Sequence, residues 1–176
     1  KKNNYYLVVG RLIPDNNCDL IIKGLLRSGS KKKIVIVGDV PYFDSYAESV
    51  KRFKSNNIIF TGYVTCQNKL TELYKNSYCY IHGHEFGGTN PTMINALYLN
   101  CQIVALNTIF NREMLKNKET IYFNKELDSI SECIKLFEKK YKEIMKKNIT
   151  YKIPRKYNWN HITKLYIRTF ESLMNF

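Results

Sequence analysis

Short apolar runs recur along the chain and alternate with segments of helical periodicity. The run Ile34–Val37 is apolar at every position, which is typical of a strand buried on both faces of a sheet. Strands that alternate with helices predict a parallel sheet covered by helices. The predicted strands are Tyr5–Val9, Lys33–Val37, Asn57–Phe60, Tyr78–Ile81, Gln102–Ala105 and Thr120–Phe123. The predicted fold class is therefore α/β, a Rossmann-like doubly wound parallel sheet of about six strands with helices on both faces.

The intervals between these runs have the spacing of amphipathic helices. The predicted helices are Asn17–Arg27, Ser45–Lys54, Asn68–Asn76, Pro91–Leu99, Arg112–Asn117, Lys125–Lys147 and Asn160–Asn175. Two of the helix starts have their own chemistry. Thr65 is a candidate cap for the third helix, and Asn90 places a capping side chain before Pro91, a residue favoured at the first helical position.

A chain of 176 residues is long enough for one buried core and too short for two ordinary domains. The segment Asn148–Tyr157, which contains Pro154, separates the last helix from the rest. We therefore expect residues 1–157 to form the main domain and residues 158–176 to form a helix that packs against another part of the protein. No apolar run approaches the roughly 20 residues that span a bilayer.

The cysteines and the net charge bear on the cellular compartment and on the class of binding partner. The five cysteines are odd in number, widely spread and never in a C-x-x-C pair, so the pattern favours neither disulfides nor zinc and indicates a reducing, cytoplasmic setting. The net charge of +13 fits nucleic acid, anionic lipid or a phosphorylated small molecule as a partner. Much of this charge lies in two lysine-rich stretches, and such stretches are commonly solvated faces.

In open α/β sheets, ligands bind at the carboxyl edge of the strands, so the loops after the strands are the candidate site. After the first strand, Gly10 permits a tight turn and Arg11 offers a planar cation suited to phosphate. Gly38-Asp39 has the composition of a simple turn. Gly62-Tyr63-Val64, after the third strand, is a candidate neighbour for a flat ring such as a nucleobase.

The fourth loop is the richest in polar groups and runs directly into a helix. Gly87 and Gly88 expose backbone N–H groups, and Thr89 and Asn90 supply short hydrogen-bonding side chains. The helix that begins at Pro91 favours an anion at its amino terminus. This loop therefore predicts a phosphate-binding turn.

The histidines in the same loop have an alternative interpretation. His82, His84 and Glu85 have the spacing of metal ligands, but no further His or Cys is placed to complete a site, so no metal is expected. His161 stands alone in the last predicted helix and is expected to be packed or exposed.

The order of these motifs resembles a known family. A strand followed by Gly-Arg and Pro-Asp-Asn-Asn, then Gly38, Gly62-Tyr63-Val64 and His-Gly-His-Glu-Phe-Gly-Gly-Thr-Asn-Pro, is similar to the carboxyl-terminal, donor-binding domain of family-four glycosyltransferases. The amino-acid sequence of the long loop is similar to that of a bacterial rhamnosyltransferase-like subgroup. The motifs cover residues 5–125. The resemblance implies a GT-B enzyme of two facing Rossmann-like domains that uses no metal or other cofactor and retains the anomeric configuration of the transferred sugar.

The resemblance also implies roles for particular residues. Arg11 matches the family arginine that neutralises the diphosphate leaving group, and we expect Arg11 and Glu85 to be the catalytic residues. Asn16 occupies the position of a family lysine, and Asn95 that of a ribose-binding glutamate. Glu85 is the only acid in the loop, although the position eight residues before Asn95 is Gly87. The implied donor-binding residues are Gly10, Arg11, Asn16, Val64, His84, Glu85, Gly87, Gly88, Thr89, Asn90 and Asn95.

The expected function is therefore donor binding in a hexosyl- or rhamnosyl-type transferase of polysaccharide biosynthesis. Its partners are a nucleotide sugar and, through an amino-terminal domain, an acceptor glycan or lipid-linked sugar. Peripheral contact with anionic lipid at the inner face of the membrane is a conjecture from the basic charge. Two alternatives stay open: a degenerate, non-catalytic nucleotide-binding scaffold, suggested by Asn16 and Asn95, and a basic nucleic-acid-binding protein, although specific nucleic-acid recognition is not expected.

Overall fold

The protein folds around a six-stranded sheet in which every strand pair is parallel. The computed structural model describes residues 3–116, 120–146 and 157–174. The strands are β1 Tyr5–Val9, β2 Lys33–Val37, β3 Ile58–Gly62, β4 Cys79–His82, β5 Ile103–Leu106 and β6 Ile121–Phe123, in the order β3-β2-β1-β4-β5-β6. Strand order reverses between β1 and β4, which makes their carboxyl ends the switch point of the sheet. The predicted α/β fold class is confirmed.

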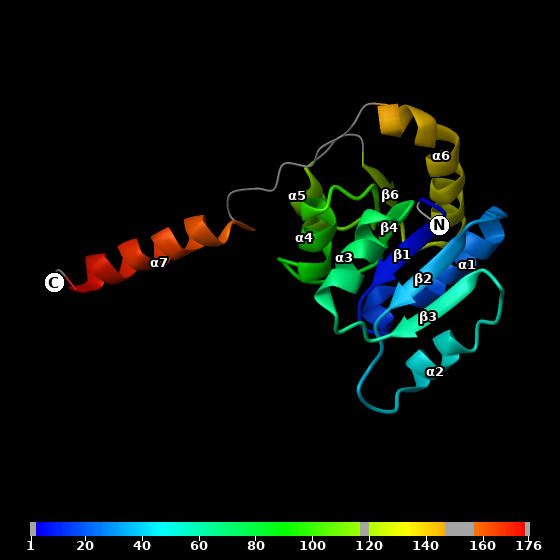
Figure 1. Ribbon diagram of the computed structural model, residues 1–176, viewed down its shortest axis with the longest axis horizontal. Coiled ribbons are helices and arrows are strands. Elements are labelled where there is room, and N and C mark those ends of the chain that lie inside the picture. Colours follow the sequence, from blue (N-terminus) through cyan, green and yellow to red (C-terminus); the bar gives the residue numbers. More distant parts are fainter. Residues whose placement is uncertain (1–2, 117–119, 147–156, 175–176) are drawn as a thin grey trace.

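Two layers of helices cover the sheet (Figure 1). The helices are η1 Pro14–Asn16, α1 Cys18–Ser28, α2 Ser45–Lys51, α3 Gln67–Lys75, α4 Pro91–Tyr98, α5 Ile109–Leu115, α6 Leu127–Lys146 and α7 Trp159–Met174. One core contains α1, α2 and α6 with sheet residues such as Tyr6 and Val8. The other contains α3, α4 and α5 with Leu7 and Val9. Alternate residues of β1 thus enter opposite cores, as expected for a strand buried on both faces.

Most helix boundaries agree with the predictions, and the exceptions have local causes. The prediction that Thr65 caps α3 is wrong, because the capping position is Cys66, which uses no side-chain hydrogen bond. The start of α5 lies three residues before the predicted Arg112, because the Thr108 side chain accepts a hydrogen bond from the Asn111 N–H and begins the helix there. The predicted Asn90 cap is confirmed by a 3.0 Å hydrogen bond from the Thr92 N–H to Asn90 Oδ1.

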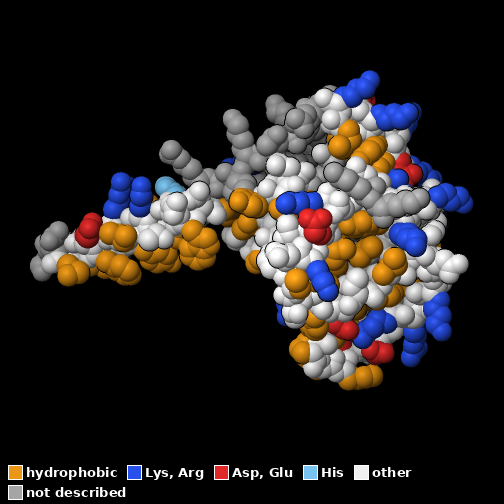
Figure 2. Space-filling model, viewed as in Figure 1, with side chains coloured by type: hydrophobic (Ala, Val, Ile, Leu, Met, Phe, Trp, Pro, Cys, Tyr) orange, Lys and Arg blue, Asp and Glu red, His pale blue; other side chains and the backbone are white. Residues whose placement is uncertain are grey.

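Helix α7 differs from the others because it has no buried residue. Figure 1 shows it extending away from the sheet, and Figure 2 shows its apolar side chains gathered along one side. Its exposed apolar residues include Trp159, Tyr166, Phe170 and Leu173. The predicted linker before it lies outside the described residues except for Tyr157, so the division into residues 1–157 and 158–176 stays a prediction.

Candidate functional site

A cleft of about 580 Å³ lies at the carboxyl ends of β1 and β2, at the edge predicted from the loop sequences. The loops after β1, β2, β3 and β4 and the start of α4 form its walls. Its lining residues are Val9, Gly10, Arg11, Ile13, Asp15, Asn16, Val37, Gly38, Tyr63, Val64, Leu70, His84, Phe86, Gly87, Asn90, Pro91 and Thr92. A cavity of this size is in the range that accommodates small-molecule ligands.

Main-chain atoms form part of the cleft, where neighbouring strand ends come close together. Gly38 has a φ of +125°, and a Cβ on it would lie 2.1 Å from the Gly10 carbonyl oxygen. The Gly10 N–H donates to the Val37 carbonyl at 3.0 Å, and the Gly38 N–H donates to the Gly62 carbonyl at 2.9 Å. A side chain at Gly38 would therefore collide with the backbone, which explains why glycine stands at this position.

Arg11 supplies a positive charge to the cleft. Its side chain is exposed and forms no ion pair with any residue that the structure describes. The backbone beneath it is held by the buried Asn16, whose Nδ2 donates to the Arg11 carbonyl at 2.7 Å. An arginine without a carboxylate partner is available to an anionic ligand.

His84 lies beside the same backbone. A Cβ on Gly10 would be 2.9 Å from His84 Cε1 and 3.1 Å from Nε2, so the missing side chain of Gly10 makes room for the imidazole. The ring stacks on His82, with 4.4 Å between centroids and an interplanar angle of 10°. Burial, and then the positive charge of Arg11, lower the pKa of His84 to about 4. His84 is therefore neutral near pH 7.

A chain of hydrogen bonds, buried at its β4 end, joins β4 to the start of α4. Tyr80 Oη lies 2.8 Å from His82 Nδ1 and 2.8 Å from Thr92 Oγ1, and Thr92 Oγ1 donates to Asn90 Oδ1 at 2.7 Å. Because Thr92 uses its only proton on Asn90, Tyr80 must donate to Thr92 and accept from His82 Nδ1–H. This accounting assigns the Nδ1–H tautomer to His82 and fixes the Asn90 cap at the cleft.

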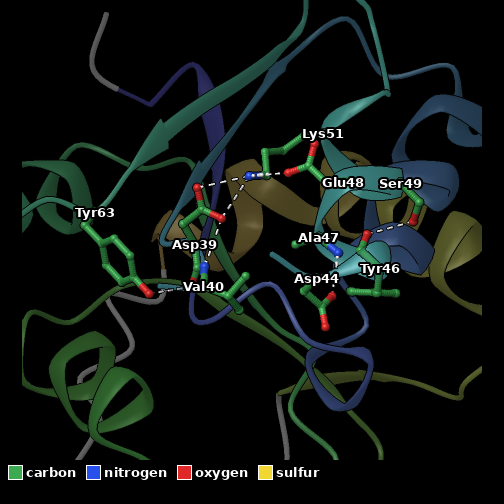
Figure 3. Close-up of polar contacts among 9 residues, drawn as sticks. All are labelled: Asp39, Val40, Asp44, Tyr46, Ala47, Glu48, Ser49, Lys51 and Tyr63. Carbon is green, nitrogen blue, oxygen red and sulfur yellow. Dashed lines mark hydrogen bonds and ion pairs between the residues drawn. The ribbon is translucent and has the colours of Figure 1, made fainter. Parts of the chain in front are cut away.

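A second polar network links Tyr63 to the loop after β2 and lies beside the start of α2 (Figure 3). The Tyr63 hydroxyl donates to the Asp39 carbonyl at 2.8 Å, and the Asp39 carboxylate accepts from the Val40 N–H and pairs with Lys51 at 3.1 Å. Asp44 caps α2 by accepting from the Ala47 N–H at 2.9 Å. The hydrogen bond to Asp39 holds Tyr63, which is 55% exposed, at the edge of the cleft.

The structure brings together only part of the predicted donor site. The predicted residues that line the cleft are Gly10, Arg11, Asn16, Val64, His84, Gly87 and Asn90. Those that do not line it are Glu85, Gly88, Thr89 and Asn95. The sequence prediction did not include Asp15, Phe86 and Thr92, which line the cleft. Phe86 had one available signal, because it is a large apolar side chain between polar residues and glycines in a loop, and it is 66% exposed.

Glu85, predicted to be catalytic, has partners outside the cleft. Its Oε1 accepts from Asn17 Nδ2 at 2.9 Å and forms an ion pair with Lys125. Burial acts to raise the pKa of Glu85, but the hydrogen bonds from Lys125 and Asn17 and the charge of Lys125 outweigh it and lower the pKa. The carboxylate is therefore ionised near neutral pH and held by Asn17 and by Lys125, which lies in the loop before α6.

The described ranges contain neither a cluster of metal-ligating side chains nor a membrane-spanning helix. No group of three or more His, Cys, Asp or Glu residues there is arranged to hold a metal ion. Among the helices of the same ranges, none is both long and apolar enough to cross a bilayer.

The parallel sheet, its switch point and the glycine-rich cleft define a Rossmann-like domain. A family model described as "Glycosyl transferases group 1" matches residues 1–155, and the chain belongs to this family. No curated protein matches the sequence. The family named from the motifs is therefore confirmed at this level, while the rhamnosyltransferase-like subgroup stays a prediction.

Solved structures with this fold are distant in sequence. Anabaena HepE in complex with UDP and glucose has a TM-score of 0.72 at 12% identity, over 99% of this chain and 49% of that one. A glycosyltransferase from Rickettsia africae ESF-5 has a TM-score of 0.72 at 13% identity, over 97% and 48%. TarM has a TM-score of 0.68 at 17% identity, over 97% and 35%. The present chain thus spans between about a third and a half of these relatives.

Proposed function

We propose that this chain is the donor-binding half of a retaining glycosyltransferase that takes a hexosyl or rhamnosyl group from a nucleoside-diphosphate sugar. The observation that carries the proposal is the position of Arg11, an exposed cation without an ion-pair partner among the described residues, in one cleft with Gly87 and the Asn90-capped start of α4. A cation, a glycine backbone and a helix amino terminus are together suited to a diphosphate. HepE has been solved with UDP-glucose, which supports this ligand class.

In the proposed reaction, the bond between the anomeric carbon and the diphosphate oxygen breaks as the acceptor hydroxyl attacks from the same face of the sugar and passes its proton to that departing oxygen. Negative charge grows on the departing diphosphate. Arg11 stabilises that charge, and the amino terminus of α4 adds its dipole, so that no metal is needed. The ring of Tyr63 and the side chain of Val64 lie where a nucleobase and ribose can pack.

Glu85 enters this scheme only through a rearrangement. Its carboxylate must leave Asn17 and Lys125 before it can reach a donor sugar in the cleft. Asn95 lies in the second turn of α4 and does not line the cleft, so its proposed contact with ribose also requires a movement. Gly88 and Thr89 also lie outside the cleft, and we propose that a movement of the loop between β4 and α4 brings them to the donor.

The acceptor, a glycan or lipid-linked sugar, is proposed to bind to an amino-terminal domain that faces this cleft. The apolar side of α7, with Trp159, Tyr166 and Phe170, is proposed to pack against that domain, because none of these side chains is buried here. Catalysis requires both domains. We therefore expect the present chain to bind a donor and to transfer no sugar by itself.

Isothermal titration calorimetry of the chain with UDP, GDP, dTDP and their sugars tests the proposal. The expected result is saturable binding of at least one of these ligands and no detectable binding of the corresponding nucleoside, because the nucleoside lacks the diphosphate. Absence of heat from every nucleotide would contradict the donor-binding function.

A non-catalytic scaffold is the second candidate, and the neutral Asn95 favours it, since an amide binds a hydroxyl more weakly than a carboxylate does. Replacing Asn95 by Glu in a protein that contains both domains distinguishes the two. An attenuated enzyme gains transferase activity, and a scaffold does not.

We also propose a cytoplasmic protein that touches anionic membrane peripherally. The support is the exposed lysines on α6, including Lys135, Lys139 and Lys142, which form a basic face. Co-sedimentation with vesicles of increasing anionic lipid content tests this, and insensitivity to that content contradicts it.

A further inference from the structure

The stacked rings of His82 and His84 are a feature that the proposed donor site does not yet explain. Both rings contain a nitrogen sealed from solvent without a hydrogen-bond partner among the described residues, Nε2 in His82 and Nδ1 in His84. Buried polar atoms in this state are uncommon in folded proteins and call for a structural or functional reason. Of the two rings, only that of His84 lines the cleft.

We propose that the His82–His84 pair takes up one proton when the diphosphate of a donor enters the cleft, so that His84 meets a phosphate oxygen as an imidazolium, through Nε2–H. The inference rests on the proposed function, since it concerns the same cleft. It adds a proton-coupled ligand for the diphosphate to the permanent charge of Arg11.

The geometry selects His84 as the ring that receives the proton. His82 is completely buried, and its Nδ1–H is already committed to Tyr80. In His84, Nδ1 is sealed, so Nε2, on the edge that packs against Gly10, is the nitrogen left to meet a ligand. Two imidazolium rings with centroids 4.4 Å apart would repel each other, which limits the pair to one proton.

The surroundings of His84 explain why its ring is neutral until the ligand binds. Burial opposes protonation most, and the positive charge of Arg11 in the loop after β1 adds to it, so the pKa of His84 is about 4 without a donor. Asp15 lines the cleft but is exposed, and the adjacent Glu85 is neutralised by Lys125. From α5, the contact is uncharged, because Asn111 Nδ2 donates to the His84 carbonyl at 3.1 Å.

A bound diphosphate reverses this balance. Its negative charges offset Arg11 and favour the charged form of any neighbouring imidazole, so the pKa of His84 rises. At a pH between the free and bound values, binding consumes a proton from solution. Donor affinity is therefore expected to increase as the pH falls from 8 to 6.

Calorimetry measures this proton directly. The probe is whichever of UDP-glucose, GDP-mannose and dTDP-glucose binds most tightly, because the diphosphate of a nucleotide sugar is esterified at both ends and does not titrate near neutral pH. Binding enthalpies at pH 6 are compared in phosphate-free buffers of different protonation enthalpy. We expect an uptake of about half to one proton per ligand in the wild type, and loss of most of it in the His84→Gln variant.

His161 provides the matched control, since it lies on α7 and outside the cleft. The His161→Gln variant is expected to retain the wild-type proton uptake. Binding without proton uptake by the wild type, or unchanged uptake in His84→Gln, would overturn this inference alone. Absence of binding by the wild type would overturn the proposed function and this inference together.

Nitrogen NMR of the unmodified protein keeps the inference testable if His84→Gln does not fold. The chain has three histidines, so the ring signals of His82, His84 and His161 can be followed separately. At pH 6 we expect a neutral His84 in the free protein and an imidazolium in the donor complex, with His82 and His161 unchanged. A His84 ring that stays neutral in the complex would overturn the inference.

Discussion

The replacement of Arg11 by alanine tests the electrostatics of the cleft most directly. Arg11 is exposed and has no ion-pair partner among the described residues, so the substitution removes one positive charge and little packing. The global fold is therefore expected to keep its free energy of unfolding within about 0.5 kcal/mol, the usual range for such surface changes. An effect on donor binding can then be attributed to the lost charge.

The expected loss follows from the exposure of the side chain. Hydrogen bonds between charged groups contribute about 1.5–3 kcal/mol, and an open, hydrated cleft favours the lower half of this range. A loss of about 2 kcal/mol corresponds to a roughly thirty-fold weaker affinity. Arg11→Lys is expected to restore only part of it, because lysine keeps the charge but loses the planar pair of donors.

The assay is calorimetric titration with the best-binding nucleotide, at low and at high salt, with Arg27→Ala as the matched control. Arg27 is also on the surface, but it pairs with Asp128 at 2.6 Å and lies outside the cleft. The Arg11 effect is expected to shrink at high salt because the interaction is screened. An affinity within about threefold of the wild type, or an equal loss in Arg27→Ala, would refute the reasoning.

Three further changes test the framework around the cleft. Gly38→Ala forces a Cβ against the backbone at positive φ and should destabilise the protein by about 3 kcal/mol or more in urea unfolding. Gly29→Ala is the control, because Gly29 has a positive φ but open space around it, and it should cost about 1 kcal/mol. Equal losses in the two variants would contradict this. The pKa of Glu85 is lowered in the folded state, so its pairing with Lys125 stabilises the fold above the unfolded-state pKa, and this stabilisation is lost as the pH falls. Glu85→Gln should therefore lower the free energy of unfolding by about 0.5–1 kcal/mol at pH 7 and by almost nothing at pH 3. A loss independent of pH would argue against the pair. None of the side chains of residues 158–174 is buried, so removal of residues 158–176 should leave the melting temperature within about 2 °C of the wild type; a drop of several degrees would show that α7 stabilises the domain.

The sheet could be predicted from the sequence because each strand is a compact apolar run between polar or glycine residues. The limits of such patterns show at β3, where Thr61 and Gly62 continue the strand past the last predicted residue, Phe60, although neither is apolar. They show again at α5, where Ile109 and Phe110 follow a capping threonine but have no helical periodicity of their own. Both boundaries are set by hydrogen bonds, which apolar patterns do not report.

The candidate site was predictable in its location and less so in its members. The Gly-Arg turn and the Asn-Pro helix start identify themselves by local chemistry, and both lie at the cleft. The orientation of Glu85 was not predictable, because its partner Lys125 comes from a distant loop and no local pattern links the two residues. The stacking of His82 on His84 likewise depends on how the loop turns after β4.

The close contact between Gly10 and Gly38 has a consequence for engineering this protein. Main chain forms this part of the cleft, so its shape does not depend on a side chain at either glycine. Tyr63 and Phe86, by contrast, stand at the rim as exposed aromatic rings. Under the proposed donor-binding function, replacing these two side chains is therefore expected to change the nucleobase preference without changing the backbone of the proposed diphosphate site.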